Sequence, residues 1–219
     1  MLSSFHSEII DGILWLGNIN GHEYLEMTLM KRLGIGVTGM PGAGKSLFSA
    51  AAEKLGLPVV RMGDIVFDEV KKRGLPLTLE NVGKIAIELR REYGPDIVAR
   101  KVIERIQSGS FENQQIIVIE GIRSLEEVNV FKNFFEEFIL VAIHAPPNIR
   151  YERLIKRGRA DDTLNVDKLK KRDLRELGMG IGNVIAMADE VLINKDKTYE
   201  AFFNECIDFL HALIKKLRD

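Results

Sequence analysis

The chain has 219 residues, of which 46% are hydrophobic and 29% charged, a composition that suits one buried α/β core. Its 31 basic and 32 acidic residues give a formal charge of −1, which excludes a global basic field for nucleic acid or anionic membranes. A single cysteine, Cys206, excludes an internal disulfide and a cysteine-based metal cage. No apolar run reaches the roughly 18 residues of a membrane span, and the first residues lack the basic start of a secretory signal. We therefore expect a cytoplasmic protein that binds neither nucleic acid nor membrane.

The N-terminal segment differs in pattern from the rest of the chain. It contains a short apolar cluster, followed by glycines and scattered polar residues; the cluster comprises Ile9, Ile10, Ile13, Leu14 and Leu16. The first clear strand pattern begins only after Lys31. We expect residues 1–30 to be an appendage outside the catalytic fold, or a segment ahead of a true start at Met27 or Met30. Residues 31–219 are expected to form one domain.

Beyond this segment, apolar runs alternate with amphipathic stretches. The runs that predict strands are 34–38, 59–62, 116–119, 138–143 and 191–194. The stretches that predict helices are 45–55, 64–74, 78–94, one from 96, one from 124, 147–158 and a closing helix from about 199. This alternation indicates a five-stranded parallel sheet with helices on both faces, the three-layer α/β fold of P-loop NTPases.

Four polar residues stand where helix N-caps are expected. They are Asp64, Thr78, Asp96 and Ser124. Ser124 is followed at the spacing of a capping box by Glu127, which strengthens the prediction of a helix start there.

Residues 39–46 carry the functional argument. They read Gly39-Met40-Pro41-Gly42-Ala43-Gly44-Lys45-Ser46 and fit G-x-x-x-x-G-K-S without a mismatch, between a predicted buried strand and a predicted helix. Glycines let backbone N–H groups approach an anion at the positive end of a helix. Lys45 is then expected to reach the β- and γ-phosphates of ATP, and the Ser46 hydroxyl to bind Mg²⁺. The alternative is a glycine-rich turn that merely caps a helix.

Two other classes of P-loop protein fit the sequence poorly. The segment 194–197 reads N-K-D-K, so its aspartate stands one position too early for the guanine-reading motif of GTPases, and no D-x-x-G follows the third predicted strand. A large mechanical ATPase does not fit because the roughly 190 residues after Met30 leave room for one domain. Small-molecule kinases remain.

An ordered set of motifs resembles an archaeal family of adenylate-kinase-related proteins, which is also similar to dephospho-CoA kinases and nucleoside monophosphate kinases. The motifs are GVTGMPGAGKS (36–46), MGD (62–64), EGIRS (120–124), RLIKRGRADD (153–162), RDLRELGMGIG (172–182) and ADEVLIN (188–194). They cover nearly all of the chain after residue 30. The resemblance implies a small arginine-bearing lid, at about 150–178, and an acceptor site.

The segment 62–64 resembles the part of adenylate kinases where the acceptor nucleotide binds. Those kinases usually carry an arginine three residues after the aspartate, where this chain has Phe67. Asp64 has two readings, which do not exclude each other. It is a helix cap, or it is a base that takes the proton of a hydroxyl acceptor.

The segment 120–123 resembles the D-G-F-P-R turn of adenylate kinases. An acidic side chain at the end of a buried strand can hold Mg²⁺, usually through water, which makes Glu120 a candidate metal ligand. Arg123 follows the strand and is expected to face the ligand crevice of the sheet. Its alternative reading is a solvated loop arginine.

Arginines recur along the next predicted helix. Arg150, Arg153 and Arg157 stand at i, i+3 and i+7 and are expected on one helix face. With Arg159, Arg172 and Arg175 they resemble the lid of nucleotide kinases, whose planar guanidinium groups neutralise a transferring phosphoryl group. The alternative is a solvated charged helix. Asn194 is expected beside the adenine, by resemblance only.

The predicted reaction is the transfer of the γ-phosphoryl group of Mg·ATP to a small nucleotide-like acceptor. Lys45, Asp64, Arg123, Arg153 and Arg157 are the predicted catalytic residues, with residues 39–46 around the phosphates and Ser46 and Glu120 at the metal. Two alternatives stay open: a dephospho-CoA-kinase-like enzyme that phosphorylates a hydroxyl, and a regulatory module that binds ATP or AMP without turnover. Self-association into a homo-oligomer is also left open.

Overall fold

The computed structural model describes residues 5–10, 13–18, 21–28, 32–111, 114–157 and 165–218. The chain divides into two compact units, Met1–Lys31 and Arg32–Asp219. Among the described residues, no helix combines the length and apolar character needed to cross a membrane.

The first unit holds an antiparallel sheet of strand order β1-β2-β3. Its strands are β1 (Phe5–Ile10), β2 (Ile13–Asn18) and β3 (Gly21–Thr28). Ile10 of β1 pairs with Ile13 of β2, and Ile13 also pairs with Thr28 of β3. The apolar cluster noted in the sequence thus falls on β1 and β2, in an antiparallel sheet that its pattern had not predicted.

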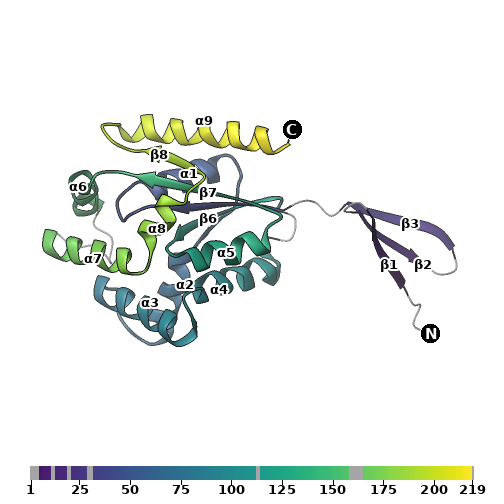
Figure 1. The fold of residues 1–219 in the computed structure, drawn as a ribbon, viewed down its shortest axis with the longest axis horizontal. Helices are drawn as coiled ribbons and strands as arrows, with labels where there is room; N and C mark the ends of the chain where they lie inside the picture. Colours follow the sequence, from purple (N-terminus) through teal and green to yellow (C-terminus); the bar gives the residue numbers. More distant parts are fainter. Residues whose placement is uncertain are drawn as a thin grey trace. The chain divides into compact units, whose positions relative to one another are not determined.

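The second unit confirms the predicted five-stranded parallel sheet, with the order β5-β6-β4-β7-β8 (Figure 1). Its strands are β4 (Leu33–Thr38), β5 (Val59–Arg61), β6 (Ile116–Ile122), β7 (Glu137–His144) and β8 (Glu190–Ile193). Gly36 in the central strand pairs with Ile119 on one side and Leu140 on the other. The carboxyl ends of all five strands therefore meet at one edge of the sheet.

Helices cover both faces of this sheet, as predicted (Figure 1). Their bounds are α1 (Lys45–Lys54), α2 (Met62–Lys72), α3 (Leu79–Tyr93), α4 (Ile97–Arg105), α5 (Leu125–Phe134), α6 (Pro147–Arg157), α7 (Val166–Gly178), α8 (Ile181–Ala186) and α9 (Tyr199–Arg218), with a π-helical turn at Ile106–Ser110 after α4. α1 and α9 pack on one face, while α2 to α5 and α8 pack on the other. α6 and α7 lie beyond the carboxyl edge (Figure 1).

Successive residues of β4 face opposite sides of the sheet, and this alternation explains how each side packs. Ile35 and Val37 join the core beneath α1 and α9. Gly34 and Gly36 face the opposite core, where a Cβ on Gly34 would lie 2.5 Å from the Phe135 ring and one on Gly36 would lie 2.4 Å from the Phe138 ring. The two glycines therefore provide the space that these aromatic rings fill. Because protein interiors are closely packed, even a methyl group at either position would collide with a ring.

The helix starts test the predicted caps. Thr78 and Ser124 are N-caps as predicted, because their hydroxyl groups accept hydrogen bonds from the amides of Asn81 and Glu127. Asp96 occupies the N-cap of α4 but its side chain makes no capping bond. The cap reading of Asp64 is wrong: α2 begins at Met62, so Asp64 stands in its first turn and Arg61 takes the cap position.

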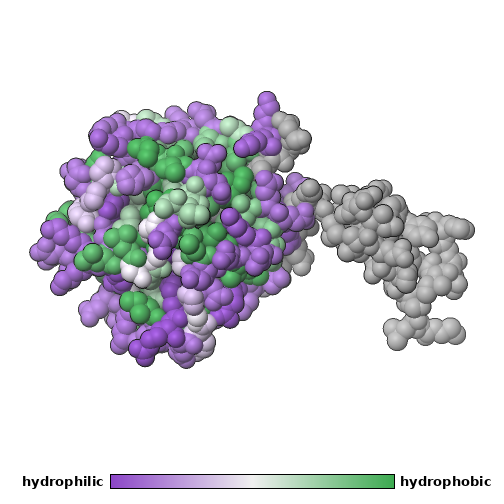
Figure 2. All heavy atoms as spheres, viewed as in Figure 1, coloured by the Kyte–Doolittle hydropathy of each residue, from purple (hydrophilic) through white to green (hydrophobic). Residues whose placement is uncertain are grey.

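The predicted closing helix is α9, which buries an apolar stripe. Phe202, Cys206 and Leu213 are buried against α1 and the sheet, whereas Tyr199 is 61% exposed. Burial raises the pKa of the Cys206 thiol to about 12, so this thiol is a packing group without thiolate reactivity. On the face of the molecule seen in Figure 2, charged and polar side chains predominate between smaller apolar areas.

Candidate active site

A cavity of about 620 Å³ opens at the carboxyl ends of the parallel strands, where ligands of open α/β sheets bind. The described residues that line it come mainly from the 39–46 loop, the start of α2, one face of α3, the end of β6, helices α6 and α7, and the β8–α9 turn. The sheet thus brings together segments that lie more than a hundred residues apart in the sequence.

The 39–46 loop is held by close backbone packing. Gly39, Gly42 and Gly44 have φ angles of 140°, 81° and 119°, in the region that favours glycine. A Cβ on Gly39 would lie 2.3 Å from the Ile143 carbonyl oxygen, and one on Gly42 would lie 2.6 Å from the Arg150 carbonyl oxygen. Glycines are therefore required both by the turn and by the neighbouring chain.

Most of the loop faces the cavity. Gly39, Pro41, Gly42, Gly44, Lys45 and Ser46 line it. Ala43 instead packs in the core beneath α1, and Met40 contributes its carbonyl oxygen to Lys45. The loop opens directly into α1, so its amides lie at the positive end of a helix, where an anion binds favourably.

Lys45 is folded back onto its own loop. Its Nζ donates hydrogen bonds to the carbonyl oxygens of Gly39 at 2.5 Å and Met40 at 3.3 Å. The pKa of Lys45 is lowered from 10.5 to about 8, chiefly by burial and also by the positive charge of Arg123, while the negative charge of Glu120 opposes the change. A cation whose charge is poorly compensated is the group expected where a polyanion binds.

Glu120, at the end of β6, is held from two sides. Its Oε2 accepts a hydrogen bond of 2.6 Å from the Ser49 hydroxyl on α1 and lies 3.5 Å from Arg61 Nε. Ser49 stands three residues after Ser46 on α1, and Ser46 and Glu120 both line the cavity. Ser49 was missed in the sequence because nothing in the loop motif marks it.

The residues present fit a Mg²⁺ ion that is bound together with phosphates. The described part of the chain contains no group of three or more His, Cys, Asp or Glu side chains able to form an all-protein metal site. Mg²⁺ needs no such group, since it typically takes one or two protein oxygens and completes its shell with water and phosphate oxygens. Ser46 and Glu120 both line the cavity and supply oxygens of this kind.

The predicted row of arginines on α6 separates into different roles. Arg150 is 3% exposed and binds Asp173 of α7 through two hydrogen bonds, of 3.0 and 2.6 Å. It also donates to the Pro41 carbonyl oxygen at 3.0 Å. Arg150 is therefore a buried clamp between α6, α7 and the loop, and the expectation that it shares a lid face is wrong.

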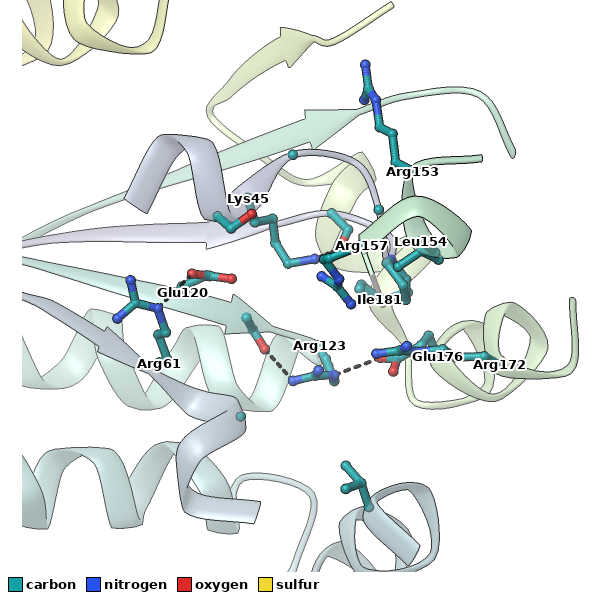
Figure 3. Close-up of a pocket in the computed structure, with 18 of the residues that line it drawn as sticks. Lys45, Arg61, Glu120, Arg123, Arg153, Leu154, Arg157, Arg172, Glu176 and Ile181 are labelled. Carbon is teal, nitrogen blue, oxygen red and sulfur yellow. Dashed lines mark hydrogen bonds and ion pairs between the residues drawn. The ribbon is translucent and has the colours of Figure 1, made fainter. Parts of the chain in front are cut away.

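Arg153 and Arg157 point in different directions (Figure 3). Arg153 turns toward the end of β8, where its Nη2 donates to the Asn194 side-chain oxygen at 3.0 Å. Asn194 in turn donates from Nδ2 to the Ala43 carbonyl oxygen at 2.9 Å. Arg157 instead extends into the cavity in the direction of Lys45 (Figure 3). Arg159 lies outside the described residues.

Arg123 lies in the cavity wall, bound to an acidic partner (Figure 3). Its Nε donates to Glu176 of α7 at 2.7 Å, and its Nη1 donates to the Gly121 carbonyl oxygen at 2.8 Å. The negative charge of Glu176 raises the pKa of Arg123. Burial alone would raise the pKa of Glu176, but the charges of Arg123 and Arg172 lower it. The alternative reading of Arg123 as a solvated loop arginine is therefore wrong.

Asp64 is half-buried at the start of α2 and lines the cavity. Burial raises its pKa, although the nearby charges of Arg61 and Arg105 act in the opposite direction. Within the described part of the chain its carboxylate accepts no hydrogen bond, which leaves it available to a ligand. Phe67, where adenylate kinases usually carry an arginine, lines the same cavity.

The parallel sheet, the loop and this cavity define a protein of the P-loop kinase fold. A family model described as an AAA domain matches residues 38–170. Among solved structures, TT1252 from Thermus thermophilus has a TM-score of 0.58 at 17% identity and covers 85% of this chain and 98% of that one. Shikimate kinase from Bacteroides thetaiotaomicron has a TM-score of 0.56 at 16% identity, with coverage of 84% and 98%. At such low identity these likenesses concern the fold alone.

Relatives of higher identity identify the family. A UPF0200 protein of Methanocaldococcus jannaschii is 48% identical over 183 residues, which cover 84% of this chain and 91% of the relative. A UPF0200 protein of Thermococcus onnurineus is 47% identical over 180 residues, with coverage of 80% and 97%. The chain belongs to the UPF0200 family, and the resemblance to an archaeal adenylate-kinase-related family is thereby confirmed.

Proposed function

We propose that the protein is an ATP-dependent phosphotransferase of nucleotide-kinase type, which moves the γ-phosphoryl group of Mg·ATP to a small nucleotide-like acceptor. The observation that carries this proposal is the meeting of the 39–46 loop, with Lys45 at its end, and of Arg123, Arg157 and Glu120 in one cavity. A glycine-rich turn that only capped a helix would not need cationic groups and a carboxylate gathered around it.

The 39–46 loop determines where the phosphoryl donor, ATP, would bind. The backbone amides at the start of α1 and the Lys45 ammonium group would hold the triphosphate, and binding would draw Lys45 from the carbonyl oxygens of Gly39 and Met40 onto the phosphates. Ser46 and Glu120 would hold Mg²⁺. When bound, the ion supplies positive charge against the phosphate oxygens. Arg153 and Asn194 lie beside the loop, where the adenosine part of ATP would extend.

Phosphoryl transfer requires positioning and neutralisation of charge more than covalent chemistry. Arg157, which extends from α6 into the cavity, is the arginine best placed to reach the transferring group (Figure 3). Arg123 is held toward the same space by Glu176 and would position the acceptor side. These groups would also exclude water once the region around α6 and α7 closed over the substrates.

A hydroxyl acceptor is the second candidate, and a specific observation favours it. Asp64 lines the cavity without a hydrogen-bond partner among the described residues, and burial raises the pKa of its carboxyl group toward the range useful for a base. Phe67 replaces the arginine that a phosphate acceptor would use. Asp64 would take the proton of the attacking hydroxyl.

A kinase screen with nucleoside monophosphates and dephospho-CoA, read by ATP consumption, tests the proposal. Lys45→Ala is expected to abolish turnover, and Asp64→Asn is expected to spare ATP binding. If Asp64→Asn leaves turnover undiminished, Asp64 is not the base. Binding of Mg·ATP without turnover of any acceptor would favour the regulatory module over the enzyme.

A further inference from the structure

The acceptor side of the cavity contains a guanidinium group that lies directly against a helical glycine. Arg175 of α7 lines the cavity and is half-buried. Its guanidinium lies against Gly83 of α3, where a Cβ would come within 2.4 Å of Nη1 and 2.5 Å of Cζ. Any other side chain at position 83 would therefore require this group to move from its place.

Gly83 stands in the interior of a 15-residue helix, where glycine is among the least favourable residues. Its φ is not in the left-handed region, so the backbone does not require glycine there. The contact with Arg175 is the feature of the structure that accounts for it.

Arg61, Arg90 and Arg123, which also line the cavity, each have an acidic partner. Arg90 binds Glu127 at 2.7 Å, and Arg123 binds Glu176 at 2.7 Å. For Arg175, no carboxylate of the described residues lies within 4.0 Å, the distance of an ion pair. Burial lowers its pKa, and the charges of Arg172 and Arg123 add to this effect, although Glu176 opposes it. A half-buried cation of this kind is stabilised when an anion binds it.

The wall beside Arg175 is apolar. α3 presents Leu79, Val82, Gly83 and Ala86 to the cavity, at the i, i+3, i+4 and i+7 positions of one helix face. α2 adds Val66 and Phe67. A ligand that fits this surface has an apolar body and one anionic group.

We propose that Arg175, seated on Gly83, binds an anionic group of the acceptor, either a phosphate or a carboxylate, and that the apolar face of α3 binds the acceptor's body. The inference rests on the proposed function because it concerns the second substrate of the same reaction. It assigns Arg175 to acceptor recognition, in place of a lid that closes over the transferring phosphoryl group. Gly83 is a positioning residue, which acts through the guanidinium that it accommodates.

Anion binding to the protein with its loop already filled tests this assignment. The 39–46 loop is first saturated with Mg²⁺ and adenylyl imidodiphosphate, a non-hydrolysable ATP analogue, and its binding is measured by calorimetry. Equilibrium dialysis with radiolabelled inorganic phosphate, and in parallel with radiolabelled acetate, then measures a second anion site. The anion that binds more tightly identifies the phosphate or the carboxylate class.

Arg175→Gln and Gly83→Ala are each expected to weaken this second anion by about tenfold or more, the effect of losing a charge-assisted hydrogen bond. Gly178→Ala is the matched control, since a Cβ on Gly178 would meet nothing within 4 Å, and it should bind like the wild type. Alanine favours a helix over glycine, so Gly83→Ala should leave Tm unchanged or raise it. Arg175→Gln leaves α3 intact and tests the site independently.

Two results would overturn the assignment: neither anion binds to the filled wild-type protein, or Arg175→Gln binds both as tightly as the wild type does. Failure of the proposed function is distinguishable, because it would appear earlier, as failure of the ATP analogue to bind.

Discussion

Replacing Lys45 with methionine is expected to stabilise the nucleotide-free protein at neutral pH, although it removes the cation that the proposed reaction needs. The Lys45 ammonium group is partly buried, and its hydrogen bonds to the carbonyl oxygens of Gly39 and Met40 do not offset the loss of water, because its pKa falls from 10.5 to about 8. Methionine has a similar length and no charge to desolvate.

The size and pH dependence of the effect follow from this pKa. A fall from 10.5 to about 8 corresponds to about 3–4 kcal/mol, at about 1.4 kcal/mol per pH unit, and this is an upper value because the side chain is not fully buried. Below about pH 8 the amine is charged in both the folded and the unfolded state, so the full cost is present. Between about 8 and 10.5 only the unfolded state holds the proton, so the stability of the wild type rises with pH toward that of the variant.

Urea denaturation followed by circular dichroism, at about pH 7 and about pH 10, measures the difference in the free energy of unfolding. Lys45→Met should be the more stable protein by about 1–3 kcal/mol at the lower pH, and the difference should shrink at the higher one. Lys84→Met, at a side chain that is 68% exposed, is the control and should change little at either pH. A Lys45→Met protein that is less stable than the wild type at neutral pH, or a difference that does not vary with pH, would refute the reasoning.

Two further substitutions test the surroundings of the loop. Arg150→Met is expected to lower the free energy of unfolding by about 3–5 kcal/mol, because the buried Asp173 loses its positively charged partner and keeps only the hydrogen bond from Tyr151. The double variant Arg150→Met/Asp173→Leu should recover most of this loss in urea denaturation, and no recovery would contradict the clamp. Gly44→Ala should lose Mg·ATP binding in calorimetry, since its Cβ would lie 2.3 Å from Asn194 Nδ2. Gly56→Ala, with a φ of 76° but open space, should keep binding, so that equal losses in both variants would point to backbone strain instead.

The fold could be predicted largely from local patterns. The β-branched run of β6 and the cap residues Thr78 and Ser124 act through their neighbours in sequence, so their roles are visible there. The error at Asp64 arose because β5 leads directly into α2, and the helix begins two residues before the aspartate. The space that Gly34 and Gly36 leave for two phenylalanine rings depends on residues a hundred positions away, which no local pattern reveals.

The candidate site likewise contains parts that a local sequence pattern predicts and parts that depend on tertiary contacts. The 39–46 loop is a contiguous motif, so its residue types and spacing are enough to predict its chemistry. The helical spacing of the arginines predicted that Arg150 shares a face with Arg153 and Arg157. The role of Arg150 depends instead on Asp173, which lies on another helix. The contact between Gly83 and Arg175 spans two helices, so it appears only once α3 and α7 are packed. Such partnerships are set by tertiary structure and have no signal in a single sequence.

The central claim is that the loop at residues 39–46 holds the phosphates of ATP. Isothermal titration calorimetry of the full chain with adenylyl imidodiphosphate, in the presence and absence of Mg²⁺, tests it most directly. We predict one saturable site in the wild-type protein, tighter with Mg²⁺, and no measurable site in Lys45→Met, whose fold is checked by circular dichroism. Equal binding by the two proteins, or no binding by the wild type, would contradict the account.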